Sequence, residues 1–424
     1  MKIRAALATL IVSTLSVHAL DWPQYRGTAG DGRTAEKIVK PWPATGPKVL
    51  WKTPAVGGFS SFSVAGGRAF TLVLRDIDGA SQETLLALDA NTGRELWIAP
   101  LGSVKFDGGG DSGASDNKGG DGPRSTPTSD GAHVFTLSSK LVLQSFDAAA
   151  GKVAWTKDLV AEHAGRNIQW QNAASPLLEG GLLYVAGGGP GESLLAIDAK
   201  DGKVAWKAFD EKMTHATPVP ATILGQRQVI FFLQSGLLAV EPKTGRELWR
   251  YNFNYSTSTA ASPVVVGDIV YCSAGYGVGV GAGAARITKS GDVFTATEVY
   301  RMRGNKPLAN HWSTPVAKDG HLYGLFQFKE YGSGPMKCID IANGTVKWEQ
   351  PGFGPGQVIL AGDQVIALSD AGELVLIDAK PDAYKELARA DVLDGKCWST
   401  PVLANGRIYA RSTKEAVCLD VSGK

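Results

Sequence analysis

The stretch Leu86-Ala-Leu-Asp89-Ala-Asn-Thr-Gly93-Arg-Glu-Leu-Trp97 decides the fold, because its acid, glycine and tryptophan recur at the same offsets along the chain. Four further copies run from Asp147 to Trp155, from Asp198 to Trp206, from Glu241 to Trp249 and from Asp340 to Trp348. Self-similarity of this kind indicates a repeat architecture, in which each unit buries its apolar face against the next.

Each copy is typical of an antiparallel hairpin. An apolar strand ends at the acid, whose carboxylate can accept backbone N–H groups of the turn, and the glycine supplies the positive φ that the turn needs. The tryptophan stands on the following strand, where its large ring can be buried against a neighbouring unit. The acid and glycine therefore predict turns, and the tryptophan predicts packing between units.

A second signature, Ser or Thr followed by Pro and an apolar strand, lies about 20 residues before the acid of a unit. It occurs at Thr126-Pro127, Ser175-Pro176, Thr217-Pro218, Ser262-Pro263, Thr314-Pro315 and Thr400-Pro401. Proline at the first residue of a strand removes no ladder hydrogen bond. Together the two signatures define units of four short strands, spaced some 40 to 58 residues apart, which is typical of propeller blades.

Counting the tryptophan positions gives eight units. They are Trp51, Trp97, Trp155, Trp206, Trp249, Trp348 and two degenerate positions, Tyr300 and Ala388. The last unit lacks its fourth strand, whereas the segment around Trp51 is a fourth strand without its first three. We therefore predict an all-β chain: a single eight-bladed β-propeller of four-stranded antiparallel blades over residues 47–424, with its ring closed by the N-terminal strand. Residues 20–46 are expected to form an arm over the surface.

The N-terminus has the pattern of a secretory signal peptide. Lys2 and Arg4 precede an apolar run over residues 5–17, and small residues follow, which predicts a signal peptide over residues 1–19 with cleavage near Ala19. No later stretch approaches the roughly 20 apolar residues that a membrane helix needs. We expect a periplasmic or secreted protein without a transmembrane segment.

Charge and cysteine content narrow the remaining possibilities. The formal net charge is +2 with no long run of one sign, so we expect no nucleic-acid partner. Four cysteines allow three disulfide connectivities, but Cys272, Cys338, Cys397 and Cys418 are scattered. We expect free, buried thiols, because an isolated cysteine often behaves as a small core hydrophobe.

The repeat resembles the pyrroloquinoline-quinone (PQQ) repeat, which is shared by quinoprotein alcohol dehydrogenases and the propeller lipoprotein of the outer-membrane barrel-assembly machinery. The resemblance covers nearly the whole mature chain. It implies two functions: a scaffold that binds a protein or an envelope polymer, or a dehydrogenase that binds PQQ beside a calcium ion and uses an Asp base. This sequence departs from the enzymes, because it has no adjacent cysteine pair and no Glu, Asn and Asp set that aligns with the calcium and base positions.

Candidate ligand-binding residues come from aligning the units on the Ser/Thr-Pro proline. Large or polar groups stand three or four residues before it, where the loops of successive blades converge at one mouth of the central channel. They are Arg124, Asn172, His215, His311, Trp312 and Trp398. One permanent cation, imidazoles and aromatic faces would suit an anionic or ring-bearing ligand. The alternative is that these side chains plug the channel and satisfy buried backbone groups.

The sequence thus favours an exported, non-catalytic propeller that binds a protein partner or an envelope or extracellular ligand. The alternative is a PQQ-dependent dehydrogenase of alcohols or sugars, and PQQ with calcium is expected only in that case. We assign no catalytic residue. We also assign no metal ligand, because His215 and His311 have no second ligand at metal-site spacing.

Overall fold

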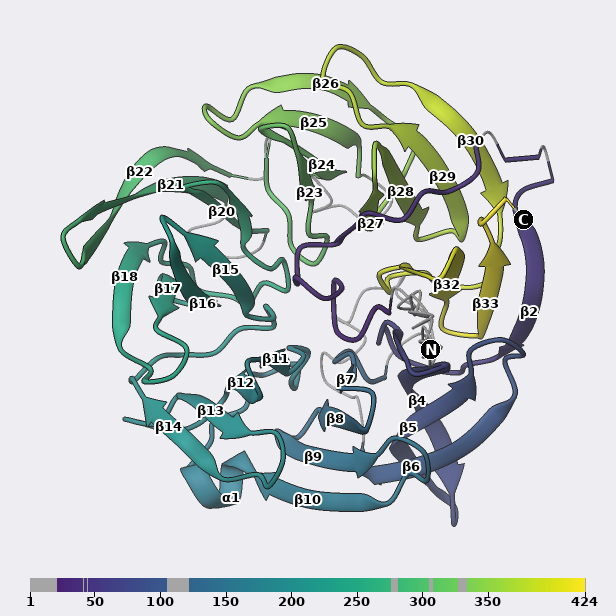
Figure 1. Ribbon diagram of the computed structural model, residues 1–424, viewed down its shortest axis with the longest axis horizontal. Coiled ribbons are helices and arrows are strands. Elements are labelled where there is room, and N and C mark those ends of the chain that lie inside the picture. The colour runs from purple at the N-terminus through teal and green to yellow at the C-terminus, as the bar shows by residue number, and fades with distance from the viewer. Residues whose placement is uncertain are drawn as a thin grey trace, which may run out of the picture.

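The computed structural model is a closed ring of eight antiparallel sheets, as predicted (Figure 1). It describes residues 21–40, 42–43, 45–104, 122–275, 281–304, 308–326 and 334–423. The predicted signal peptide, residues 1–19, lies outside the described residues. In the described chain no helix is long and apolar enough to cross a membrane.

The first four blades follow one another along the chain, each with its inner strand first and its outer strand last. Their strands are β3 (Ser63–Ala65), β4 (Arg68–Ile77), β5 (Ala80–Asp89) and β6 (Glu95–Ser103); β7 (Thr128–Ser129), β8 (His133–Leu137), β9 (Val142–Asp147) and β10 (Val153–Asp158); β11 (Leu177–Glu179), β12 (Leu182–Ala186), β13 (Leu194–Asp198) and β14 (Val204–Ala208); and β15 (Val219–Ile223), β16 (Gln226–Leu233), β17 (Gly236–Val240) and β18 (Glu247–Asn252). The short helix α1 (Leu159–His163) follows β10.

Blades five to seven repeat the pattern, and blade eight takes its outer strand from the N-terminus. Their strands are β19 (Val264–Val266), β20 (Ile269–Ala274), β21 (Gly281–Ser290) and β22 (Val293–Arg303); β23 (Val316–Lys318), β24 (His321–Leu325), β25 (Met336–Asp340) and β26 (Val346–Gln350); β27 (Gly356–Ala361), β28 (Gln364–Ser369), β29 (Glu373–Asp378) and β30 (Glu386–Asp391); and β31 (Val402–Ala404), β32 (Arg407–Arg411), β33 (Glu415–Asp420) and β2 (Lys48–Pro54).

Ring closure occurs as predicted. Strand β2 pairs antiparallel with β33, from Lys48 opposite Asp420 to Pro54 opposite Glu415. The first and last parts of the chain therefore share one sheet, and the ring has no open end between blades.

Tryptophans and glycines form an outer circle of contacts between blades, which we define by Trp51, Trp97, Trp155 and Trp206. Each indole donates its N–H to a backbone carbonyl of the next blade, at Ala90, Ala148, Ala199 and Pro242 respectively, over 2.8–3.2 Å. Each ring also covers the turn glycine of that blade: a Cβ on Gly151 would lie 2.6 Å from the ring of Trp97. The glycine is therefore required by its positive φ of 68° and by the ring above it.

Hydroxyl groups form an inner circle, made by the Ser or Thr before the signature prolines and by Ser61, which holds the same position before Phe62 in blade one. Thr126 N donates to Ser175 Oγ over 2.8 Å, and Ser175 N donates to Thr217 Oγ1 over 2.9 Å. The same bond recurs from Ser61 N to Thr126, from Ser262 N to Thr314 and from Thr400 N to Ser61. Each hydroxyl that accepts such a bond joins two neighbouring blades. The sequence explained the proline of this signature but not its hydroxyl.

Blade seven lacks the Ser/Thr-Pro signature, and a glutamine takes its place in the inner circle. Gln357 Nε2 donates to Trp312 O in the loop before blade six and to Trp398 O in the loop before blade eight, over 3.1 and 3.2 Å. One amide therefore spans the gap in the hydroxyl pattern.

The N-terminal arm is embedded more deeply than an arm over the surface, although it does cross one face of the ring (Figure 1). Trp22 exchanges two backbone hydrogen bonds with Val64 of blade one. Strand β1 (Arg33–Thr34) adds a fifth, parallel strand to the inner side of β27 in blade seven. Trp22 and Arg26 are both only 2% exposed. The arm is buried because it packs against the inner strands of blades one and seven.

Arg26 anchors the arm on the far side of the channel. Its guanidinium donates to Thr314 O and Pro315 O over 2.9 Å and to Asp31 O over 3.0 Å. Burial lowers the pKa of this guanidinium. A buried arginine with several carbonyl acceptors is a rigid attachment, because an unsatisfied charge at this site would be costly.

All four cysteines are free and buried, which confirms the expectation from their spacing. Cys272 is among those at 0% exposure, and burial raises its pKa above the usual range of a thiol. These thiols are core residues.

Candidate functional site

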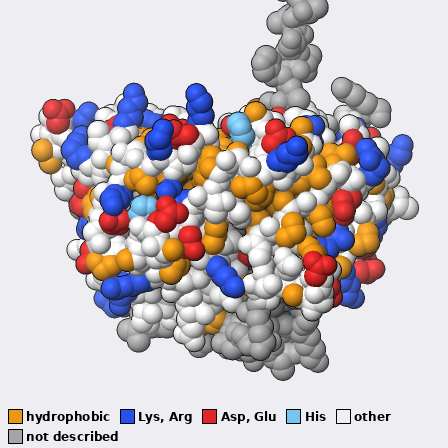
Figure 2. Space-filling model, turned by 90° about the horizontal axis from the view of Figure 1, so that it is seen from below, with side chains coloured by type: hydrophobic (Ala, Val, Ile, Leu, Met, Phe, Trp, Pro, Cys, Tyr) orange, Lys and Arg blue, Asp and Glu red, His pale blue; other side chains and the backbone are white. Residues whose placement is uncertain are grey.

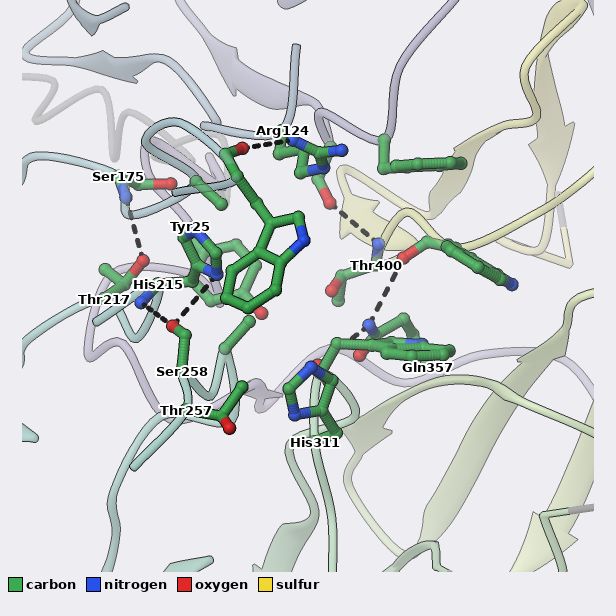
Figure 3. A pocket seen from close by; sticks show the side chains of 17 residues that line it. Tyr25, Arg124, Ser175, His215, Thr217, Thr257, Ser258, His311, Gln357 and Thr400 are labelled. Atoms are coloured by element: carbon green, nitrogen blue, oxygen red, sulfur yellow. Dashed lines mark hydrogen bonds between the residues drawn. The ribbon is translucent and has the colours of Figure 1, made fainter. Parts of the chain in front are cut away.

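A cavity of about 540 Å³ occupies the centre of the ring, where the loops that lead into the inner strands converge (Figure 3). All six residues that stand three positions before a signature proline line it: Arg124, Ala173, His215, Ala260, Trp312 and Trp398. The ring geometry explains this, because equivalent positions of successive blades face the same axis. Tyr25 of the arm also lines the cavity, so the arm contributes part of its wall.

The structure brings together five of the six residues that the sequence singled out: Arg124, His215, His311, Trp312 and Trp398. In Figure 3, Arg124, His215 and His311 lie around the same space. They come from the loops before blades two, four and six.

Asn172 is the exception, and its inclusion in the group at the channel mouth is wrong. It is 1% exposed and does not line the cavity. Its amide donates to the carbonyls of Leu137, Ser138 and Ala174 over 3.0–3.3 Å, so it holds the loop to the neighbouring blade. The fourth residue before the proline is also an anchor at Thr214, which donates to Phe232 O on β16 of its own blade.

One wall of the cavity is a stack of aromatic rings. The ring centroids of Trp312 and Trp398 are 4.5 Å apart, and those of Trp398 and Phe59 are 4.8 Å apart, with interplanar angles of 31° and 34°. His311 meets Trp312 edge-on at 5.7 Å. Such offset aromatic contacts are favourable and hold each ring in a fixed orientation.

Trp170, His215 and Arg124 form a second group of lining residues. The rings of Trp170 and His215 meet edge-on at 6.5 Å, and Arg124 Nη1 donates to Trp170 O over 2.9 Å. This bond ties the guanidinium to the backbone of Trp170.

Both cavity histidines are neutral at physiological pH. Burial, followed by the nearby charge of Arg124, lowers the pKa of His215 to about 3. Burial, followed by the repulsion from His215 that arises when both rings are protonated, lowers the pKa of His311 to about 3 as well. His215 lies between Gln171 O, 2.8 Å from Nε2, and Ser258 Oγ, 3.0 Å from Nδ1. In the neutral ring Nε2 therefore donates to the carbonyl and Nδ1 accepts from the serine.

Several lining residues were not found from the sequence. Phe59 stands three positions before Phe62, which occupies the proline position of blade one, so the signature was hidden by one substitution. Tyr25 lies outside the repeat pattern altogether. The inner-circle bond of Ser61 with Thr126 is the feature that aligns blade one with the others.

The lining offers no carboxylate among the residues that the structure describes. Over the same described ranges, no group of three or more His, Cys, Asp or Glu side chains is placed to hold a metal ion. The lining residues therefore supply aromatic faces, neutral hydrogen-bonding groups and the cation of Arg124.

The model of one protein family, described as outer membrane protein assembly factor BamB, matches residues 81–323 and 260–384. The chain belongs to this family. The assembly factor BamB of Yersinia pestis is 24% identical over 298 residues, which are 66% of this chain and 69% of that protein. A tetrathionate hydrolase of Acidithiobacillus ferrooxidans is also 24% identical, over 246 residues, but the match spans 54% of this chain and 44% of the hydrolase.

Solved structures of two kinds share the propeller of this family member. BamB of Moraxella catarrhalis superposes with a TM-score of 0.60 at 14% identity, over 89% of this chain and 98% of that one. The quinohemoprotein alcohol dehydrogenase of Comamonas testosteroni superposes with a TM-score of 0.66 at 12% identity, over 96% of this chain and 81% of that one. At these identities the likeness establishes the fold alone.

Proposed function

We propose that this chain is an exported, non-catalytic propeller that works by binding, and that its central cavity holds an envelope or extracellular ligand. The observation that carries the proposal is the lining of the cavity: stacked rings and Arg124 surround about 540 Å³, without a carboxylate among the described lining residues. Pockets of this size and composition are typical of sites for small ligands.

The described lining does not fit PQQ with calcium, the pair expected if the chain were a PQQ-dependent dehydrogenase. Ca²⁺ takes six to eight oxygen ligands, usually including carboxylates, and a dehydrogenase of this type also needs an Asp base. The described lining provides only neutral oxygens, such as those of Thr257 and Gln357, and two histidines with a pKa of about 3. We therefore derive no redox step for this cavity.

Family membership supports a protein partner in addition to a small ligand. The relatives named as assembly factors of outer-membrane proteins share the repeat over about two thirds of this chain. The side of the ring shown in Figure 2 presents acidic and basic side chains interspersed with apolar ones. A mixed surface of this kind is compatible with a protein partner or an envelope polymer.

The deciding experiment adds PQQ and Ca²⁺ to the purified mature protein and follows quinone absorbance and dye reduction with alcohols and sugars. We expect neither stoichiometric uptake nor turnover, and uptake with turnover would overturn the non-catalytic proposal. Fractionation of the native cells and sequencing of the mature N-terminus test export, for which cleavage near Ala19 is expected. A pull-down from the envelope fraction tests the protein partner.

A further inference from the structure

The N-terminal arm meets the inner strands at one level of the ring. In blades one, two, three and seven, the residue three positions after the inner-circle residue donates its backbone N–H to the arm over 2.7–3.0 Å. These donors are Val64, Ser129, Leu178 and Leu360, and their respective acceptors are Trp22 O, Pro23 O, Gln24 Oε1 and Gly32 O. The innermost strand of a blade has a free edge toward the channel, so the arm pairs groups that would otherwise face it.

Two further contacts carry the arm across the channel. Gly30 lies against Pro220, which holds the same position in blade four: a Cβ on Gly30 would lie 3.0 Å from Pro220 Cδ. Arg26 donates to Thr314 O and Pro315 O, where the inner strand of blade six begins. The arm thus touches the inner strands of blades one to four, six and seven, and Figure 1 shows it in purple, crossing the centre of the ring.

The cavity lies beside this level, on the side of the loops. Its lining includes inner-circle residues such as Thr217 and residues two positions before them, such as His215. The arm binds three positions after the inner-circle residue, and three residues of an extended strand span about 10 Å. Along the inner strands the order is therefore loop, cavity and arm, so the arm forms one end of the cavity.

Tyr25 is the arm residue that faces the cavity (Figure 3). Its two neighbours hold it in place, because Gln24 and Arg26 are 5% and 2% exposed and bind blades three and six. Tyr25 itself is partly exposed and lines the cavity. A molecule in the cavity can therefore touch its side chain.

We infer that the arm turns the central channel into a blind pocket. The arm seals one end, Tyr25 is the floor, and a ligand enters and leaves through the opposite end, where the loops before the inner strands converge. The sides of the cavity are the blades of a closed ring, which leaves the two channel ends as the routes through the described chain. The inference rests on the proposed binding function and adds to it the route to the site and a further residue that a ligand touches.

Thiol labelling tests the route without knowledge of the ligand. Tyr25→Cys places one reactive thiol at the floor, since the four native cysteines are buried and burial raises their pKa. Thr28→Cys is the matched control, at an exposed position of the arm outside the cavity. N-ethylmaleimide should label both variants, and Tyr25→Cys should react more slowly, because the reagent must first pass through the cavity.

Filling the cavity on its loop side identifies the end that the reagent uses. Ala260 lines the cavity two positions before Ser262, and Ala260→Trp should slow the labelling of Tyr25→Cys at least about tenfold and leave Thr28→Cys unchanged. If Ala260→Trp does not fold, Ala173→Trp fills the equivalent position of blade three. Labelling of native cysteines, followed by mass spectrometry, reports any unfolding.

Three outcomes overturn the inference. Labelling of Tyr25→Cys that Ala260→Trp does not slow means that the reagent arrives from the arm side. Equal slowing of Thr28→Cys means that the added indole acts elsewhere than in the cavity. No labelling of Tyr25→Cys in the protein that keeps Ala260 means that the floor is not reached from the loops.

These outcomes are separable from failure of the proposed function. Labelling needs no ligand, so uptake of PQQ with turnover would overturn the non-catalytic proposal and leave the blind pocket in place. Conversely, labelling of Tyr25→Cys that ignores Ala260→Trp removes the floor, while the binding proposal still stands on the cavity lining.

Discussion

The outer and inner circles join the same blades by different means. In the outer circle an indole covers a glycine of the next blade and donates to a carbonyl beside it, as Trp97 does with Gly151 and Ala148. In the inner circle a small hydroxyl accepts one backbone N–H, as Thr217 does from Ser175. The outer contact uses an indole, and six of the eight units keep the tryptophan while Tyr300 and Ala388 replace it in the other two. The inner contact needs only one oxygen. The residue two positions before the hydroxyl residue is therefore free to vary, and it lines the cavity.

The largest effect is expected where the outer circle loses a whole ring. Trp206 is 9% exposed, covers Gly245 and donates to Pro242 O. Trp206→Ala should lower the free energy of unfolding by about 3–5 kcal/mol, as for other buried aromatic truncations. Urea unfolding followed by circular dichroism measures it. The matched control is Trp170→Ala in the cavity, which should lose less than about 1.5 kcal/mol. Equal losses would show that the outer circle has no special structural role.

The glycine side of the outer circle is tested by adding one methyl group. Gly151 has a φ of 68°, and a Cβ there would lie 2.6 Å from the ring of Trp97. Gly151→Ala should therefore destabilise the fold by about 2–4 kcal/mol, from backbone strain and the clash together.

Gly267 separates those two contributions. Its φ is 61°, but a Cβ there would meet nothing within 4 Å. Gly267→Ala should cost only the strain of the left-handed backbone, about 1–2 kcal/mol. If the two alanine variants unfold at the same denaturant concentration, the indole does not restrict the turn.

The inner circle should respond more weakly to the loss of one hydroxyl. Thr217→Val keeps the shape of the side chain but leaves Ser175 N without its acceptor, which lies 2.9 Å away. A buried N–H without a partner costs about 1–3 kcal/mol. Thr217→Ser restores the oxygen and should recover most of the loss. A stable Thr217→Val protein with an unstable Thr217→Ser protein would mean that the methyl group, rather than the hydroxyl, joins the blades.

The sequence predicted the outer circle more completely than the inner circle, and the reason is physical. In the outer circle the indole of one blade meets the turn glycine of the next, so recurring offsets of acid, glycine and tryptophan reveal the blades and the closing strand around Trp51. An inner contact uses a hydroxyl that serine and threonine share, and Gln357 replaces it in blade seven through an amide. Side-chain direction is not visible in an alignment, which is why Asn172 was grouped with residues that it does not face.

The arm shows a second limit of the sequence. Residues 21–40 contain no repeat signal, yet Tyr25 lines the cavity and Arg26 binds carbonyls of the loop before blade six. These contacts join residues 288 and 289 positions apart in the chain. Long-range contacts made by single side chains leave no periodic pattern, so the arm could be recognised only as a segment outside the propeller.

The smallest expected effect concerns the two cavity histidines and appears only in acid. Their pKa is 6.5 as a reference and about 3 in the folded protein. Below pH 6.5 the unfolded chain takes up protons that the folded chain does not, so the free energy of unfolding falls as the pH falls from about 6.5 toward 3. The loss is at most about 1.4 kcal/mol per pH unit for each histidine.

Replacing one of the histidines should flatten that dependence. His215→Gln cannot titrate, so between pH 6 and 4 its unfolding free energy should fall less steeply than that of the unmodified protein, by about 1 kcal/mol per pH unit. Carboxylates contribute equally to both proteins and cancel in the difference. His133→Gln, outside the cavity, is the control and should keep the steeper slope. If His215→Gln keeps it too, the cavity is wet enough for the imidazole to charge without unfolding, and His215 is not held neutral by burial.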